Sequence, residues 1–269
     1  MWGTSKMDLQ LKNKVAIIGG SSKGLGKGCA LQLAKEGANV VICARNEDAL
    51  LKTANEIKQK TSSKILAIQA DLSKDFGVEK VINKTLAKFR RIDILVNNSG
   101  GPQPGEFMEF TDKDWDKAYE SLLLYVVRMC RLVIPHMKKN KWGRIINITS
   151  LTVKEPEETL ILSNVFRSGV VSLAKSISKD LIKYNITINN LCPGAFKTDR
   201  AIELMKNQAK NSKKTIKDIE KENVSKFSLG RYQEPEELGN LVAFLCSELA
   251  KGITGTTLQI DGGISKCLF

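Results

Sequence analysis

The sequence predicts an α/β fold in a single domain, with a seven-stranded parallel sheet and helices on both faces. Short apolar segments, most of them β-branched, alternate strictly with helical patterns along the chain. Strict alternation of strand and helix builds a parallel sheet with right-handed crossovers. The strand segments are apolar throughout, as expected for strands that are buried on both faces. The expected strands are residues 15–18, 40–43, 65–69, 94–97, 145–148, 186–191 and 257–260, and the expected helices are residues 23–36, 46–60, 76–89, 115–138, 159–184, 201–227 and 234–249.

Length and composition fit one globular domain over residues 1–269. No Pro- or Ser-rich linker divides the chain, and 42% of its residues are hydrophobic. The net charge of +13 would suit a nucleic-acid partner, but the lysines are dispersed, which favours a solvated basic surface. No apolar run approaches the about 18–20 residues of a membrane span, and residues 1–14 lack the apolar core of a signal peptide. We therefore expect a cytoplasmic protein that binds neither nucleic acid nor membranes.

The six scattered cysteines and the single histidine do not have the spacing of a metal site. Most of the cysteines lie in apolar runs, which is typical of buried, reduced thiols. We therefore expect no metal.

The first expected strand ends at a glycine cluster with the spacing Gly20-x-x-x-Gly24-x-Gly26. An apolar helical pattern begins at Leu25, so this segment is predicted to be a strand, a tight turn and a helix. Such a turn brings backbone N–H groups and the positive end of a helix up to a phosphate, and glycine leaves room for the phosphate. The alternative is an ordinary strand-to-helix turn, which the spacing alone leaves open.

Polar residues and glycines also follow the later strands, at the points where those strands end. In a parallel sheet, ligands bind beyond the carboxyl ends of the strands. These segments therefore predict one binding crevice along a single edge of the sheet. They are Arg45-Asn46, Asp71-Leu72, Asn97-Asn98-Ser99-Gly100, Thr149-Ser150 and Pro193-Gly194.

Together these motifs resemble the short-chain dehydrogenase/reductase family over nearly the whole chain. The glycine turn resembles the family's T-G-x-x-x-G-x-G, with Gly19 in place of threonine, and residues 97–100 resemble N-N-A-G. Pro193-Gly194 with Thr198 resembles P-G-x-x-x-T, and residues 253–263 resemble the end of the 3-oxoacyl-(acyl-carrier-protein) reductases. The resemblance implies a Rossmann fold and an oxidoreductase that interconverts a carbonyl and an alcohol with a nicotinamide cofactor.

Charge at the end of the second expected strand favours NADP as the cofactor and makes NAD the less favoured one. Proteins that bind NAD place a carboxylate there for the ribose 2′-hydroxyl, but this chain has Arg45 and no carboxylate before Glu47. Arg45 and Lys23 are both expected to reach a 2′-phosphate, and arginine matches phosphate geometry well. The alternative is that Arg45 is only a solvated residue at a helix start. The expected cofactor-binding residues are Gly20, Ser22, Lys23, Gly24, Leu25, Gly26, Arg45, Asp71, Leu72, Asn98, Ser99, Gly100, Arg167, Pro193, Gly194 and Thr198.

Three of the four catalytic positions that the resemblance implies hold other residues. Ser150 matches the family's serine, but Ser163 stands at the tyrosine position and Arg167 at the lysine position. Leu122 stands where the family has an asparagine that holds a water. A serine hydroxyl is far less acidic than a phenol, whereas arginine stays charged and can still hold ribose hydroxyls. The usual proton relay is therefore absent, and the expected catalytic residues are Ser150, Ser163 and Arg167.

Two functions remain open at this point. In the first, the protein is an oxidoreductase whose proton donor is Ser150, Ser163 or a water that they hold. Lys154 is a further candidate, although a solvated lysine is the simpler interpretation. In the second, it is a catalytically inactive nucleotide-binding protein with a structural or regulatory role. The helical pattern around Leu162-Ser163-Asn164 is intact, which favours the enzyme.

The resemblance also bears on substrate and assembly. It implies that residues 195–230 form a lid over a small-molecule substrate. Lysines in this segment would attract an anionic substrate such as an acyl thioester, or they form only the polar face of a solvated helix. Helices 115–138 and 159–184 carry wide apolar faces, which family members pair across a dimer axis. We expect a homo-oligomer, either a dimer or a tetramer.

Overall fold

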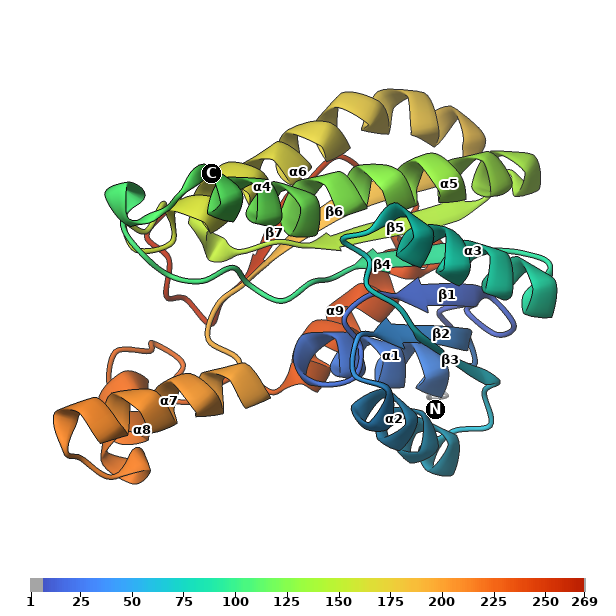
Figure 1. Ribbon diagram of the computed structural model, residues 1–269. Helices are drawn as coiled ribbons and strands as arrows, with labels where there is room; N and C mark the ends of the chain where they lie inside the picture. Colours follow the sequence, from blue (N-terminus) through green and yellow to red (C-terminus); the bar gives the residue numbers. More distant parts are fainter. Residues whose placement is uncertain (1–6, 269) are drawn as a thin grey trace.

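The computed structural model describes residues 7–268, except for the side chains of residues 207 and 211. One parallel sheet of seven strands, in the order β3-β2-β1-β4-β5-β6-β7, runs through the molecule (Figure 1). This confirms the predicted sheet. The strands are β1 (Val15–Ile18), β2 (Asn39–Ala44), β3 (Ile65–Gln69), β4 (Ile94–Asn97), β5 (Gly143–Ile148), β6 (Ile186–Pro193) and β7 (Thr257–Ile260).

Helices cover both faces of the sheet, with α1, α2 and α9 on one side and α3, α5 and α6 on the other (Figure 1). The α-helices are α1 (Gly24–Lys35), α2 (Glu47–Lys60), α3 (Asp75–Phe89), α4 (Asp112–Tyr119), α5 (Tyr125–Asn140), α6 (Ile161–Leu181), α7 (Asp199–Ser212), α8 (Ile216–Val224) and α9 (Pro235–Cys246). Short helical turns are η1 (Phe107–Glu109), η2 (Glu120–Leu124), η3 (Leu151–Val153), η4 (Ile182–Tyr184) and η5 (Glu248–Ala250). Among residues 7–268, no helix is both long enough and apolar enough to span a membrane.

Two expected helices are divided in the structure. Residues 115–138 fall into α4 and α5, which the π-helical turn η2 joins. Residues 201–227 fall into α7 and α8, because Lys213 takes a left-handed conformation (φ 54°) and ends α7. Thr215 then begins a new helix, since its side chain and that of Asp218 form a capping box.

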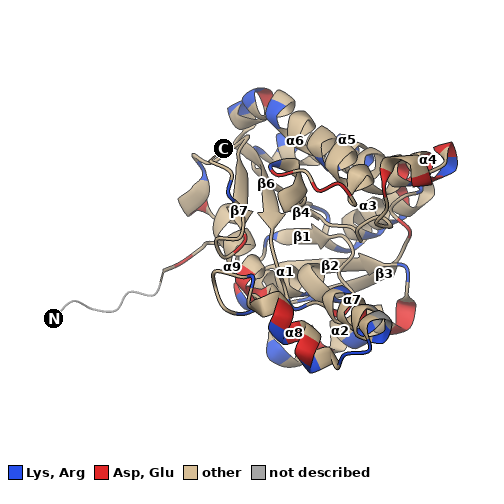
Figure 2. Cartoon of the chain, turned by 90° about the vertical axis from the view of Figure 1, so that its left-hand side faces the viewer, with Lys and Arg blue, Asp and Glu red and all other residues tan. Residues whose placement is uncertain are grey.

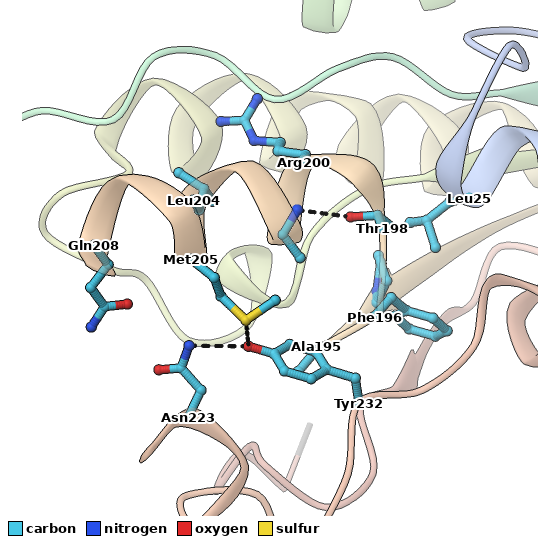
Figure 3. A pocket seen from close by; sticks show the side chains of 13 residues that line it. Leu25, Ala195, Phe196, Thr198, Arg200, Leu204, Met205, Gln208, Asn223 and Tyr232 are labelled. Carbon is cyan, nitrogen blue, oxygen red and sulfur yellow. Dashed lines mark hydrogen bonds between the residues drawn. The ribbon is translucent and has the colours of Figure 1, made fainter. Parts of the chain in front are cut away.

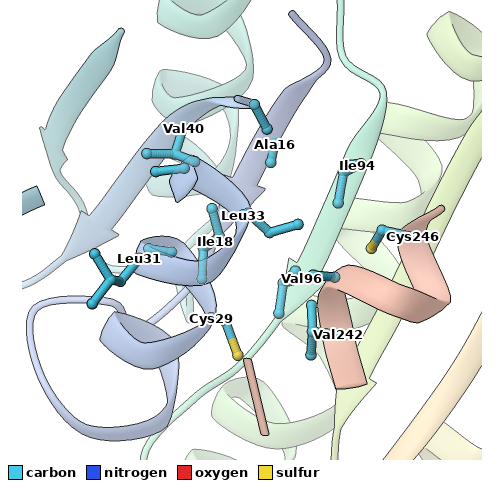
Figure 4. Close-up of a cluster of buried hydrophobic side chains, with 14 of the residues drawn as sticks. Ala16, Ile18, Cys29, Leu31, Leu33, Val40, Ile94, Val96, Val242 and Cys246 are labelled. Carbon is cyan, nitrogen blue, oxygen red and sulfur yellow. The ribbon is translucent and has the colours of Figure 1, made fainter. Parts of the chain in front are cut away.

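The core lies in two layers, one on each face of the sheet. On the α1 and α9 face, Ile18 and Val96 of the sheet pack with Cys29, Leu33 and Val242 of the helices (Figure 4). The thiols of Cys43, Cys130 and Cys246 are buried and free, and burial raises the pKa of each to about 12. These thiols therefore stay protonated at neutral pH and act as small apolar groups.

Helices α1 and α9 cross at two glycines. A Cβ on Gly28 would overlap the carbonyl oxygen of Pro235, and a Cβ on Gly239 would lie 2.6 Å from the carbonyl oxygen of Gly28. Gly28→Ala is therefore expected to lower the free energy of unfolding by about 1–3 kcal/mol, as overpacking does. Chemical denaturation measures this, with Gly252→Ala as the control because nothing lies within 4 Å of its added Cβ. Equal stability of the two variants would contradict the close crossing.

A row of buried amides crosses the sheet from Asn97, the last residue of β4, and Asn147, the next to last of β5, to Asn190 of β6. Asn97 Nδ2 donates to Asn147 Oδ1 (2.8 Å), and Asn147 Nδ2 donates to Asn190 Oδ1 (2.9 Å). Asn190 Nδ2 then donates to Thr257 Oγ1 (3.1 Å). The four residues are in register across β4, β5, β6 and β7. We call this row the amide ladder.

Helices α7 and α8 project from the body of the molecule (Figure 1). They share a small core of Met205, Ala209 and Ile219. The two ends of this excursion are held together, because the N–H of Lys197 donates to the carbonyl oxygen of Gln233 (2.8 Å) and the N–H of Gln233 to that of Ala195 (2.9 Å). Along α8, basic residues are interspersed with acidic ones (Figure 2). Within the segment 195–230, α7 and α8 thus form the projection, while Phe196 is buried in the main core. The action of this segment as a lid stays a prediction.

Candidate active site at the carboxyl edge of the sheet

The glycine turn between β1 and α1 is held from below by Asn98. Asn98 Nδ2 donates to the carbonyl oxygens of Gly19 (3.0 Å) and Gly20 (3.2 Å). Gly20 has a φ of 53°, and a Cβ on Gly26 would lie 2.5 Å from the carbonyl oxygen of Gly20. Among the described side chains, none caps the start of α1, and its first turn has no acidic residue. The turn therefore presents free backbone N–H groups and the positive end of a helix dipole.

The predicted phosphate-binding cations flank this turn. Lys23 precedes α1 and Arg45 follows β2, and both side chains are exposed. Two backbone contacts fix the loops that carry them: Thr53 Oγ1 donates to the carbonyl oxygen of Ser22 (2.7 Å), and Gln69 Nε2 to that of Arg45 (3.1 Å). Both cations are thus anchored by their backbones, with side chains that extend into solvent.

The other predicted cofactor residues lie along the same edge. Asp71 Oδ1 accepts hydrogen bonds from the N–H (3.0 Å) and Oγ (2.8 Å) of Ser73, so this carboxylate shapes its own turn after β3. Leu72 is half-buried and packs against the core layer on the α3, α5 and α6 face of the sheet. After β4, Ser99 is half-buried and Gly100 is exposed.

The segment after β6 lies against the glycine turn. A Cβ on Gly24 would come within 3.5 Å of Thr198, which caps α7 by accepting from the N–H of Ala201 (3.2 Å). A Cβ on Gly194 would lie 2.6 Å from the Cα of Asp261, so Pro193-Gly194 packs closely on the turn after β7. The structure therefore brings Gly24, Leu25, Pro193, Gly194 and Thr198 together, while their contact with a cofactor stays a prediction.

A cavity of about 410 Å³ opens between this segment and the projecting helices (Figure 3). Leu25, Phe196, Leu204, Met205 and Tyr232 give it a largely apolar lining. Arg200 stands at its rim and joins two loops, because its guanidinium donates to the carbonyl oxygens of Gly101 (2.8 Å) and Pro102 (3.0 Å). This link between the loop after β4 and the start of α7 was not predicted from the sequence.

Ser150 and Ser163 do not touch, because Thr152 lies between them. Thr152 Oγ1 donates to Ser150 Oγ (3.1 Å) and lies 3.5 Å from Ser163 Oγ. Ser150 is half-buried at the end of β5, whereas Thr152 is 7% exposed and Ser163 4% exposed. Of the three residues, Ser150 is therefore the most exposed.

Arg167 projects from α6 to the end of β5 and is 8% exposed. Its Nη1 donates to the carbonyl oxygens of Ile148 (2.9 Å) and Thr149 (3.1 Å). Burial lowers the pKa of this guanidinium, while the neighbouring phenol of Tyr125 acts in the opposite direction. Arginine nevertheless keeps its charge in proteins. Arg167 is thus a buried cation that is held at the carboxyl end of β5.

Leu122 lies in the π-helical turn η2 and is buried with Ala118 and Leu162 in an apolar cluster. One turn later, Tyr125 begins α5 close to Arg167, and burial raises the pKa of its phenol to about 12. The structure therefore places no polar side chain at position 122, but it brings a phenol that sequence reasoning missed into the neighbourhood of Arg167.

The family model described as enoyl-(acyl carrier protein) reductase matches residues 20–265. The 3-oxoacyl-(acyl-carrier-protein) reductase FabG of Chlamydia muridarum is 32% identical over 259 residues, which cover 96% of this chain and all of that protein. The chain belongs to the short-chain dehydrogenase/reductase family. An uncharacterized oxidoreductase of Bacillus subtilis, YvrD, is a similarly close member, 32% identical over 266 residues that cover 97% of this chain and all of YvrD.

Among solved structures, L-sorbose reductase from Gluconobacter frateurii, in complex with NADPH and L-sorbose, superposes with a TM-score of 0.94. It is 33% identical, and the match covers 97% of this chain and all of that one. The family's Rossmann fold is therefore confirmed for this chain, in agreement with the resemblance seen in its motifs.

Proposed function

We propose that this short-chain dehydrogenase/reductase uses NADP(H) to interconvert a carbonyl group and an alcohol. The observation that best supports this proposal is that two cationic features lie at the carboxyl edge of the sheet: the free N-terminus of α1 behind the glycine turn, and the buried Arg167 at the end of β5. The first suits a pyrophosphate and the second suits the hydroxyls of a ribose. Similar solved structures described as NADPH complexes or as NADPH-dependent support this cofactor.

The residues present fit a dinucleotide. A Cβ on Gly26 would overlap the carbonyl oxygens of Gly19 and Gly20, so glycine at this position lets the turn close tightly on the start of α1. We propose that the exposed Lys23 and Arg45 hold a 2′-phosphate. Asp71 and Leu72 would lie at the adenine end of the cofactor. Pro193, Gly194 and Thr198 would lie at the other end, beside the cavity. The remaining proposed contacts are Gly20, Ser22, Gly24, Leu25, Asn98, Ser99 and Gly100.

The bound cofactor supplies or accepts a hydride. In the reducing direction, the Ser150 hydroxyl donates a hydrogen bond to the substrate oxygen and stabilises its developing negative charge. Arg167 holds the cofactor by charge-assisted hydrogen bonds from a guanidinium that is fixed on the end of β5. Since Ser163 lies behind Thr152, we propose that it acts through Thr152, and that water supplies the proton to the oxygen that Ser150 stabilises.

NADPH is expected to bind more tightly than NADH, because only NADPH carries a 2′-phosphate for Arg45 and Lys23. Arg45→Ala is expected to weaken NADPH binding about tenfold, or about 1.4 kcal/mol, and to leave NADH binding nearly unchanged. Fluorescence titration of both reduced cofactors measures this, with Lys84→Ala as the control because Lys84 is exposed on α3. Tighter binding of NADH by the unmodified protein would contradict this preference.

Turnover of a panel of carbonyl compounds and alcohols, with NADPH oxidation or NADP⁺ reduction as the readout, tests the proposed reaction. Acyl thioesters belong in the panel because the relatives include 3-oxoacyl-(acyl-carrier-protein) reductases. The alternative function, nucleotide binding without turnover, is favoured by the apolar surroundings of Leu122 and the buried position of Ser163. Cofactor binding without turnover of any compound would select this alternative.

We also propose that the protein is a homo-oligomer. Tyr119 of α4, Leu132 of α5 and Val165 of α6 are exposed apolar side chains on the helices that were predicted to pair. Light scattering measures the assembly, and a stable monomer would contradict it.

A further inference from the structure

The hydroxyl of Thr152 stands between those of Ser150 and Ser163 in a row of three. Two groups of Thr152 donate to Ser150 Oγ: its Oγ1 at 3.1 Å and its backbone N–H at 3.2 Å. On the other side, Ser163 Oγ is 3.5 Å from Thr152 Oγ1. Thr152 and Ser163 are both buried, so the row is shielded from solvent at the Ser163 end.

The hydrogen atoms of this row can be assigned from the capacity of each group. A hydroxyl has one hydrogen to donate and two lone pairs that accept. The two donors of Thr152 occupy both lone pairs of Ser150 Oγ, so the hydrogen of Ser150 is left to point away from Thr152. Thr152 Oγ1 donates its single hydrogen to Ser150. Ser163 must therefore be the donor in the contact between Ser163 and Thr152. The row therefore runs in one direction, from Ser163 through Thr152 to Ser150.

We infer that Thr152 is a positioning residue that fixes Ser150 as a hydrogen-bond donor to the substrate oxygen. This role rests on the proposed function. Hydrogen bonds in series polarise one another, so the two hydroxyls behind Ser150 strengthen its outward bond. A donor that already points at the place where charge develops needs no reorganisation during the reaction.

The row of hydroxyls contributes more to stabilising the substrate oxygen here than it would in a protein with a tyrosine at position 163. With serine at position 163, no acidic phenol occupies the usual place of the proton donor, so stabilisation of the substrate oxygen depends on Ser150. In the reducing direction, the hydride moves to the carbonyl carbon and the carbonyl π electrons move to oxygen. Ser150 stabilises this oxygen, and a water then supplies its proton and leaves hydroxide to the solvent.

Thr152→Val tests the role, because valine keeps the shape and the backbone N–H but lacks the hydroxyl. One lone pair of Ser150 is then free, and its hydrogen can turn inward toward Ser163. We expect kcat for the best substrate of the panel to fall about 10–100-fold, less than or comparable to the loss of a direct oxyanion donor. KM and the NADPH dissociation constant are expected to stay within about twofold of the unmodified protein, since neither depends on the direction of this hydrogen.

Thr152→Ser should restore most of the lost kcat, because it returns the hydroxyl. Thr159→Val, an exposed threonine in the same loop, serves as the matched control and should leave kcat unchanged. Thermal unfolding of each variant shows whether the fold is intact. A Thr152→Val protein that is folded and as fast as the unmodified one would overturn the role of Thr152 alone. An unmodified protein that binds NADPH but turns over no compound would overturn the proposed function, and this role with it.

Discussion

Asn147→Leu is expected to lower the free energy of unfolding by about 2–5 kcal/mol, a large share of the stability of an ordinary domain. Asn147 is the central member of the amide ladder and is 1% exposed. Leucine has the same branching but cannot form hydrogen bonds, so Asn97 Nδ2 loses its acceptor and Asn190 Oδ1 loses its donor. Each buried polar group left without its partner costs about 1–3 kcal/mol.

Guanidinium chloride unfolding of Asn147→Leu and of the unmodified protein measures this effect. Asn55→Leu is the control, because Asn55 is exposed on α2 and its replacement is expected to change stability by no more than about 0.5 kcal/mol. If Asn147→Leu were as stable as the control, the hydrogen bonds of the amide ladder would not contribute to the free energy of unfolding.

Arg167→Met is expected to raise the dissociation constant of NADPH about 10–100-fold. Methionine removes the buried cation at the carboxyl end of β5 and also leaves the carbonyl oxygens of Ile148 and Thr149 without this donor. Loss of hydrogen bonds from a charged group costs about 1.5–3 kcal/mol, which corresponds to this range. Arg167→Lys keeps the charge but not the planar fork, so we expect a smaller loss of affinity.

Calorimetric titration with NADPH distinguishes these variants, and Arg131→Met is the matched control because Arg131 is exposed on neighbouring α5. The stability of each variant is measured separately by unfolding. A loss of stability shows how much of the change in the dissociation constant arises from disorder at the end of β5. An unaltered dissociation constant for folded Arg167→Met would mean that Arg167 only supports the sheet.

The sheet could be predicted from the sequence because its strands are short, apolar and regularly spaced. The helix boundaries were less predictable. The division of residues 201–227 depends on the left-handed backbone of Lys213, which side-chain periodicity does not reveal. A signal was present in Thr215-x-x-Asp218, whose capping box begins α8, and Thr111-x-x-Asp114 likewise places the start of α4 earlier than predicted.

The candidate site was predictable where a motif lies within one turn, and less so where the fold brings distant residues together. The glycine turn and Pro193-Gly194 meet at one edge, as expected for parallel strands. Thr152 was not predicted to belong to the site, because its hydrogen bond to Ser150 depends on the backbone conformation of η3. The contacts of Arg200 were not predicted either, because its partners, Gly101 and Pro102, lie about a hundred residues earlier in the chain.

The amide ladder also bears on how the strands find one another during folding. Strands β4, β5 and β6 are rich in isoleucine, leucine and valine, which would pack nearly as well after a slip of two residues. Such a slip of β5 against β4 would set Asn97 opposite Ile145 or Thr149 instead of Asn147. It would bury amides without their partners, so the misaligned sheet would be less stable by several hydrogen bonds. The ladder therefore acts as a check on strand alignment that apolar packing alone would not provide.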